Sequence, residues 1–259
     1  MTEFVSSFVD VAGCRTRFWR GGEGPTLLYL HGSQGVPAPL PFMQRLAKNF
    51  EVLAPEHPGF GESESPPWLA NIHDLAYFYL DFLEALDLRD VVVVGQALGG
   101  WIAAEAAIRD SSRLRRLVLA GAPGLDAPEA ATLDVFSMSD EALAPYLFHD
   151  PALAETARAR AVASQESPIA RKNRESLERI ARACRFVDPD LAKWLHRVRV
   201  PTLLLWGEND RAVLPAIGSR YASLIPGARR VLLPACGHLP HVERAADYVA
   251  AIEAFAAAP

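Results

Sequence analysis

Runs of mostly apolar residues, each ended by glycine or proline, recur along the chain. They cover residues 26–30, 50–54, 91–94, 114–120, 200–206 and 229–233. Runs of this kind are typical of strands that are buried on both faces of a parallel sheet. Segments between them carry apolar residues at helical spacing, as in residues 72–86, where Asn71 stands at the N-cap position. This alternation predicts a mostly parallel, eight-stranded sheet with helices on both faces.

Two parts of the chain depart from the alternation. Residues 4–11 and 14–20 read as a hairpin, which would add antiparallel strands to one edge of the sheet. Residues 125–199 are mostly helical and contain no convincing strand, and their clearest helix begins at Pro168 after Ser167 as N-cap.

We therefore predict two structural units. Residues 1–124 and 200–259 would form an α/β core domain, and residues 125–199 would form a helical lid inserted into it. In such folds, ligand sites form outside the carboxyl ends of the strands, so the predicted lid would lie over the site.

Composition excludes several classes of function. The chain has 259 residues, 50% of them hydrophobic, and a net charge of -5, which predicts no basic surface for nucleic acid. Its three cysteines lie far apart and form no Cys-x-x-Cys pair, so neither a disulfide framework nor a zinc site is expected. The sequence shows no signal-peptide pattern and no apolar run of about 18 residues, so the prediction is a cytoplasmic protein with no membrane partner.

The stretch around residue 97 carries the chemical signal. Four valines, residues 91–94, are followed by a turn with Gly95 and Gly99 and then by a good helix former from Trp101. A strand, a sharp turn and a helix are the setting of a nucleophile elbow, usually Gly-x-Ser-x-Gly. Here the central residue is Ala97, whose methyl group cannot attack a substrate.

Two later strand ends supply candidates for the partners of a nucleophile. Asp210 follows the buried strand that ends at Trp206, and His238 follows the next strand. The order nucleophile, acid, base is the one expected for this arrangement. An imidazole takes the proton of a serine hydroxyl, and a carboxylate fixes the tautomer of that imidazole and stabilises its cation.

Attack on a carbonyl also creates an oxyanion, which needs two backbone N–H donors. One is expected from Leu98, the residue after the nucleophile position. The other is expected from the loop after the third strand, where Ser33 would act through its main chain.

Taken in order, these motifs resemble those of a lid-bearing α/β-hydrolase of the serine hydrolase and esterase branch. The resemblance covers nearly all of the chain outside the predicted lid. Its motifs are His31-Gly32, residues 58–63 (PGFGES), residues 95–100 (GQALGG), residues 207–210 (GEND) and Gly237-His238. The resemblance places the triad roles on Ala97, Asp210 and His238, and the oxyanion hole on Ser33 and Leu98.

One position departs from the family pattern, and it decides activity. Leu98-Gly99-Gly100 resembles the serine branch, so we expect a parent protein with serine at position 97 and a catalytically dead variant in the chain as given. The alternative is that Ala97 is native and the chain is a non-catalytic ligand-binding protein on the hydrolase scaffold.

The resemblance implies an enzyme that needs no cofactor and no metal and acts on a small molecule. Our leading expectation is a carboxylesterase that cleaves a small or medium ester through an acyl-enzyme. Hydrolysis of a carbon–carbon bond in a vinylogous diketone ranks lower, because Gln96 and Leu239 stand where such enzymes typically have asparagine and tryptophan. Cofactor-free oxygen chemistry, the substrate itself and the choice between monomer and homodimer stay open.

Overall fold

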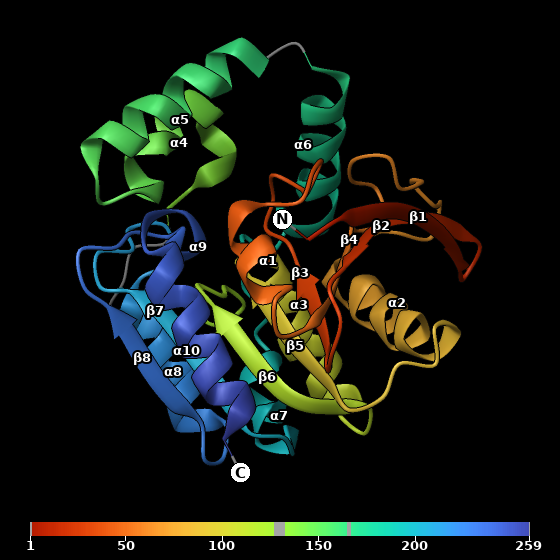
Figure 1. Cartoon of the computed structure of the whole chain (residues 1–259). Helices are drawn as coiled ribbons and strands as arrows, with labels where there is room; N and C mark the ends of the chain where they lie inside the picture. The colour runs from red at the N-terminus through yellow and green to blue at the C-terminus, as the bar shows by residue number, and fades with distance from the viewer. Residues whose placement is uncertain (1, 127–132, 165–166, 259) are drawn as a thin grey trace.

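The protein is described by a computed structural model that covers residues 2–126, 133–164 and 167–258 (Figure 1). Its strands are β1 (Phe4–Val11), β2 (Cys14–Gly21), β3 (Thr26–Leu30), β4 (Glu51–Pro55), β5 (Val91–Gln96), β6 (Leu114–Ala120), β7 (Thr202–Gly207) and β8 (Arg229–Leu233). They form one sheet in the order β1-β2-β4-β3-β5-β6-β7-β8. The pairs β1–β2 and β2–β4 are antiparallel, and all other pairs are parallel. The predicted fold class is therefore confirmed.

Helices cover both faces of the sheet. The sheet divides the buried apolar side chains into two cores, one on each face. The helices are α1 (Pro41–Leu46), α2 (Ile72–Ala85), α3 (Leu98–Arg109), α4 (Asp140–Leu147), α5 (Pro151–Ser164), α6 (Pro168–Ala181), α7 (Leu191–Trp194), α8 (Pro215–Leu224), α9 (Pro240–Glu243) and α10 (Ala245–Ala257), with 3₁₀ turns at Val135–Ser137 and Leu195–Arg197. Buried residues of α2, α3 and α8 share one core, and those of α1 and α10 share the other. None of the described helices combines the length and hydrophobicity that a bilayer crossing requires.

Strand β5 shows why the central strand is a run of valines. Successive side chains of a strand point to opposite faces. Val91 and Val93 therefore belong to the core on the α2–α3 side, and Val92 and Val94 belong to the core on the α1–α10 side. All four are 0–4% exposed, so both faces of the strand need an apolar residue at every position.

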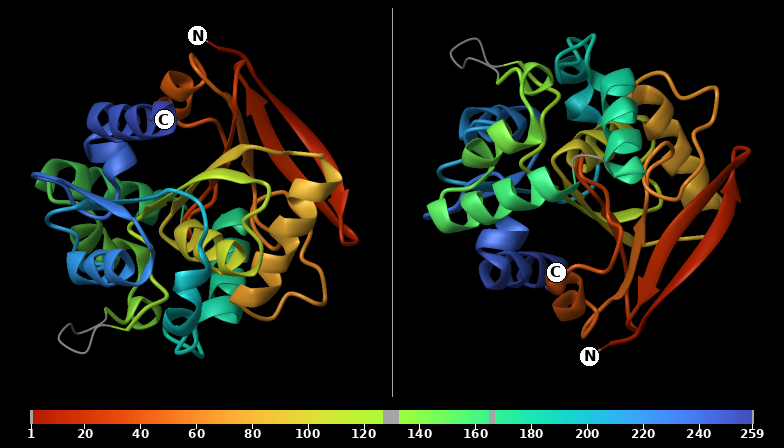
Figure 2. Two further views of the ribbon diagram at one scale, coloured as in Figure 1. Left: turned by 90° about the horizontal axis from the view of Figure 1, so that it is seen from below. Right: turned by 90° about the horizontal axis from the view of Figure 1, so that it is seen from above.

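Helices α4, α5 and α6 lie beyond one end of the parallel strands (Figure 1), and the view from above shows α5 running across that end (Figure 2). The segment that carries them leaves and re-enters the core at one place. Gly124 pairs with Val187, the N–H of Gly124 donates to the carbonyl of Phe186 at 2.9 Å, and the N–H of Asp188 donates to the carbonyl of Gly124 at 2.8 Å. The division into a core domain and a lid stays a prediction, and residues 127–132 and 165–166 of the lid lie outside the described residues.

The two predicted helix starts turn out differently. The Asn71 side chain accepts hydrogen bonds from the N–H groups of His73 and Asp74, so it caps α2 as predicted. Ser167 precedes α6, but its side chain makes no capping hydrogen bond. Pro168 stands at the first helical position as predicted, where its missing N–H and its fixed φ suit the start of a helix.

Candidate active site

The turn between β5 and α3 has the strained backbone expected of a nucleophile elbow. Ala97 has φ 50° and ψ −115°, a conformation that costs an L-residue about 1–3 kcal/mol. The chain on both sides leaves no room for side chains: one at Gly95 would collide with the backbone of Gly99, and one at Gly99 with the backbone of Leu30. A Cβ at Gly32 would lie 3.4 Å from that of Ala97, so the loop after β3 passes directly beside the methyl group.

The structure brings His238 and Asp210 together. His238 Nδ1 lies 2.8 Å from Asp210 Oδ2, and the two residues are 6% and 2% exposed. Asp210 Oδ1 accepts the N–H groups of Ala212 and Val213 at 2.9 Å each, which fixes the carboxylate. In this arrangement Nδ1 donates its proton to the carboxylate, and Nε2 keeps the lone pair that a general base needs. The catalytic roles of both residues stay predictions.

Two neighbours set the position of the imidazole relative to residue 97. Gln96, which precedes Ala97, donates from Nε2 to the carbonyl of His238 at 3.0 Å. Gly121 ends β6 with φ +56°, and a Cβ there would come within 3.2 Å of the His238 ring. A larger residue at position 121 would therefore push the imidazole out of place. Sequence reasoning found neither contact, because both join segments that are far apart along the chain.

The predicted oxyanion-hole residues lie on two sides of Ala97. Leu98 is the first residue of α3, where backbone N–H groups have no partner within the helix and the helix dipole favours a negative charge. Ser33 lies in a turn that is closed by a hydrogen bond from the N–H of Gly35 to the carbonyl of Gly32 at 3.2 Å. The oxyanion-hole roles of Ser33 and Leu98 stay predictions.

A stacked pair of neutral histidines supports that turn from within the core. The rings of His31 and His57 lie 3.6 Å apart, and the two residues are 1% and 0% exposed. His31 Nδ1 donates to the carbonyl of Gly32 at 2.6 Å, which leaves Nε2 to accept the N–H of His57 at 3.0 Å. His57 Nε2 in turn donates to the carbonyl of His31 at 2.9 Å, and its Nδ1 accepts the hydroxyl of Tyr79 at 2.5 Å.

Every ring nitrogen of this pair thus has a partner of the right kind when both histidines are neutral. Burial lowers the pKa of His31 to about 4 and holds the pKa of His57 well below its usual range. The pair supports the turn at residues 32–35 from within the core.

Glu243 fastens the loop that carries His238 to the segment between α4 and α5. Its Oε2 accepts the N–H of Gly237 at 2.5 Å, and its Oε1 accepts the N–H groups of His149 and Asp150 at 2.7 and 2.8 Å. The N–H of His238 itself donates to the carbonyl of Leu147 at 2.9 Å. The predicted lid thus contacts the loop of the candidate base directly, and sequence patterns gave no sign of Glu243 in this role.

Cys236 is the one thiol close to His238 in sequence, and its environment makes it a poor nucleophile. Burial, with smaller contributions from Glu243 and Asp210, raises its pKa to about 12, so the thiolate is scarce at neutral pH. Its fully buried position agrees with its interpretation as a small core residue.

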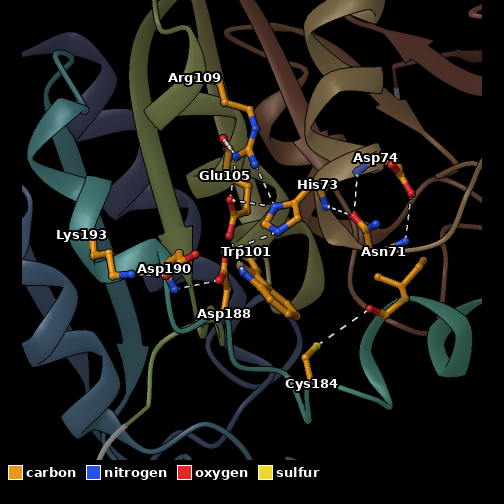
Figure 3. A network of polar contacts seen from close by, with 11 residues as sticks. Asn71, His73, Asp74, Trp101, Glu105, Arg109, Cys184, Asp188, Asp190 and Lys193 are labelled. Carbon is orange, nitrogen blue, oxygen red and sulfur yellow. Dashed lines mark hydrogen bonds and ion pairs between the residues drawn. The ribbon is translucent and has the colours of Figure 1, made fainter.

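A second polar cluster joins α2, α3 and the segment after α6 (Figure 3). His73, Glu105 and Asp188 place ligand-type atoms within 4.8 Å of one another. Arg109 already lies among them, donating to Glu105 Oε2 at 2.7 Å and to His73 Nδ1 at 2.8 Å. Trp101 Nε1 donates to the other Glu105 oxygen at 3.1 Å. Because the guanidinium supplies the positive charge that these groups need, we interpret the cluster as a structural network.

Comparison with known proteins shows the family of the chain. The family described as Alpha/beta hydrolase family matches residues 27–252. The chain belongs to the alpha/beta hydrolase family. This α/β-hydrolase is similar to 2-hydroxymuconate semialdehyde hydrolase of Pseudomonas putida, with 31% identity over 95% of this chain and 92% of that protein.

Two further relatives show how the similarity is distributed. The protein of the same name from Pseudomonas sp. strain CF600 is 38% identical over 49% of this chain and 46% of its own length. Among solved structures, a meta-cleavage product hydrolase from Pseudomonas fluorescens IP01, in a serine-to-alanine mutant complexed with acetates, aligns with a TM-score of 0.81. That alignment covers 96% of each chain at 23% identity, and it supports the fold.

Proposed function

We propose that this α/β-hydrolase binds a small acyl compound at Ala97 and that serine at position 97 would make it a hydrolase. The observation that carries the proposal is the His238–Asp210 pair, buried and bonded at 2.8 Å beside a strained elbow that has no nucleophile. A histidine whose Nδ1 is bonded to a buried carboxylate is arranged to take a proton at Nε2 from a neighbouring hydroxyl. Alanine preserves the site and removes the attacking atom.

The proposed reaction of the Ala97→Ser form follows from these groups. The introduced serine hydroxyl would give its proton to His238 Nε2, and its oxygen would form a bond to the substrate carbonyl carbon, whose π electrons move to oxygen. The N–H groups of Leu98 and Ser33 would stabilise that oxyanion. Collapse breaks the bond to the leaving group, which takes the proton from His238, and water then releases the acyl group by the same steps.

For the substrate class we propose a vinylogous diketone that is cleaved at a carbon–carbon bond. The curated relatives named above support this choice over an ester, because 2-hydroxymuconate semialdehyde hydrolase matches nearly the whole chain. A carbon leaving group is poor unless its electron pair is delocalised, so such a reaction needs a conjugated enol or ketone beyond the bond that breaks. His238 would then deliver its proton to carbon.

Ester hydrolysis is the second candidate, and two residues favour it. Gln96 precedes the nucleophile position and Leu239 follows His238. At these two positions the carbon–carbon branch of the family typically has asparagine and tryptophan. Gln96 Nε2 donates to the His238 carbonyl, and Leu239 is the half-buried N-cap residue of α9. An ester needs no group that protonates carbon, because its alkoxide leaving group takes the histidine proton directly.

We also propose that residues 125–199 act as a lid that selects the substrate. The supporting contacts are those of Leu147 with the N–H of His238 and of Glu243 with His149 and Asp150. These bonds hold the α4–α5 segment against the loop of the base, so its side chains would meet a substrate bound at Ala97.

The test compares the chain as it stands with Ala97→Ser on a panel of 2-hydroxy-6-oxo-dienoates and p-nitrophenyl esters. The Ser form should hydrolyse one class and form a covalent adduct with a fluorophosphonate at residue 97, as mass spectrometry would show. The Ala form should bind the same compound, which a change in the absorbance of that compound would report. Its turnover should be lower than that of the Ser form by about a millionfold. A folded Ala97→Ser protein that stays unlabelled and inactive on the whole panel would refute the hydrolase proposal and favour a native binding protein.

A further inference from the structure

One side chain of α6 links the turn at residues 32–35, which passes beside the elbow, to the loop at residues 59–63. Asn173 is 6% exposed, and its Nδ2 donates to the carbonyl of Gln34 at 3.0 Å while its Oδ1 accepts the N–H of Gly61 at 2.9 Å. One partner is an acceptor and the other a donor, so the orientation of the amide is fixed by its neighbours. Both halves of the amide are therefore used, and exchanging either one would leave a buried polar group unpaired.

The Gln34 carbonyl belongs to the turn that presents the predicted oxyanion donor. Gln34 directly follows Ser33, and the turn is closed by the hydrogen bond from Gly35 to Gly32. Gly35 has φ +81°, and a Cβ there would come within 3.0 Å of Asn173 Nδ2. Gly35 thus meets two requirements of the turn: it adopts a positive φ without strain, and it leaves room for the Asn173 amide.

Other anchors of α6 contact a different loop. Lys172 Nζ donates to the carbonyls of Gly61 and Ser63 at 2.9 and 2.5 Å, and Ser176 Oγ donates to the carbonyl of Gly59 at 2.5 Å. These bonds hold the helix to residues 59–63. Within the described ranges, Asn173 is the α6 residue whose side chain bonds to the turn at residues 32–35.

We propose that Asn173 is a positioning residue that holds the Ser33 N–H in place for the oxyanion. This inference rests on the proposed function of the Ala97 site. The bond to Gln34 fixes the turn one residue away from the donor, and the donor acts on charge that develops only in the transition state. Loss of Asn173 should therefore lower kcat and leave the binding of the ground-state substrate almost unchanged.

The experiment uses Asn173→Ala and Asn173→Asp, with Ser176→Ala as the matched control that removes an α6 anchor without touching the turn. Asn173→Asp keeps the acceptor for the Gly61 N–H and so protects against simple loss of fold. In the chain as it stands, amide hydrogen exchange of the peptide covering residues 32–36 should speed up about tenfold in both Asn173 variants, because the bond that closes the turn opens more often. Ser176→Ala should leave that exchange unchanged.

In the Ala97→Ser background, both Asn173 variants should lose about tenfold in kcat with less than about a threefold change in KM. That loss is smaller than the roughly hundredfold or greater cost of deleting an oxyanion donor outright, because the donor is displaced and not removed. Unchanged exchange, or a KM effect that Ser176→Ala reproduces, would overturn the inference. If Ala97→Ser is inactive on every substrate, the proposed function fails, and the exchange measurement still decides whether Asn173 holds the turn.

Discussion

The neutral pair His31 and His57 beside the turn at residues 32–35 predicts a specific loss of stability in acid. Protonation of His31 would turn Nε2 from an acceptor into a donor that faces the N–H of His57, and protonation of His57 would place a charge in the same fully buried stack. The folded protein therefore resists protonation of both rings, whereas the unfolded chain does not. The sign follows: stability is fully present above the usual histidine pKa of about 6.5 and is lost as the pH falls toward the folded-state pKa.

The size of the effect follows from the pKa of His31. A pKa of about 4 in the folded state, against 6.5 for the free side chain, corresponds to about 3 kcal/mol at about 1.4 kcal/mol per pKa unit. His57 acts in the same direction, so the free energy of unfolding should fall by at least about 3 kcal/mol between pH 7 and pH 4 from this pair. That is a large fraction of the stability of a typical domain.

The assay is urea denaturation of the unsubstituted chain and His31→Gln at pH values between 8 and 4. Gln offers an oxygen to accept the His57 N–H and does not titrate. The variant should therefore be less stable at pH 7, but its free energy of unfolding should fall less steeply with acid, because the contribution of His31 is gone. His196 is exposed, and His196→Gln provides the matched control with the unsubstituted slope. Equal slopes for the unsubstituted chain and His31→Gln between pH 6.5 and 4 would refute the reasoning.

Two other positions, Glu105 and Ala97, give predictions about the stability of the fold. Burial and the neighbouring Asp188 raise the pKa of Glu105 above 4.5 despite Arg109, so its contribution to stability is lost as the pH rises through the folded-state pKa. In urea titrations from pH 4 to 7, the unsubstituted chain should therefore lose stability relative to Glu105→Gln, and a difference that stays constant with pH would contradict this. Ala97→Gly should relieve backbone strain of about 1–3 kcal/mol at the cost of about 0.5–1 kcal/mol of chain entropy. We expect a higher denaturation midpoint, and a loss of more than about 1 kcal/mol would show that the elbow is not strained.

Much of the architecture could be predicted from local patterns. The valines of β5 fill two cores at once, and that double burial is what a continuous apolar run indicates. Asn71 caps α2 through bonds within three residues, so its role was visible in the sequence. Asp210 and His238 could be proposed as partners because each follows a parallel strand, the buried β7 and the mostly exposed edge strand β8, and parallel strands end at one edge of the sheet.

The contacts that hold the site together could not be predicted in the same way. Asn173 lies 139 residues from Gln34, and Gln96 lies 142 residues from His238. Neither pair leaves a trace in periodicity, because a buried polar side chain, whether on strand β5 or on helix α6, is chosen by its tertiary partner. Glu243 is a further example, since in the sequence it is one acidic residue near the start of a helix. The named relatives support a different substrate class from the ester that the motifs led us to expect, because substrate choice depends on side chains that sequence motifs do not place.

The elbow keeps its strained backbone although residue 97 carries no hydroxyl group. No hydroxyl holds Ala97 in its positive-φ conformation, so the strain is maintained by the strands and glycines around it. The N–H of Ala97 donates to the carbonyl of Ala120 at 2.8 Å, and its carbonyl accepts the N–H groups of Gly100 and Trp101. Asp210 and His238 are likewise fixed by backbone groups and by Gln96, none of which involves residue 97 as a side chain. Under the proposed function, a single oxygen atom on Cβ of residue 97 would meet a base and an oxyanion hole already in position, because their free energy of ordering is supplied by folding.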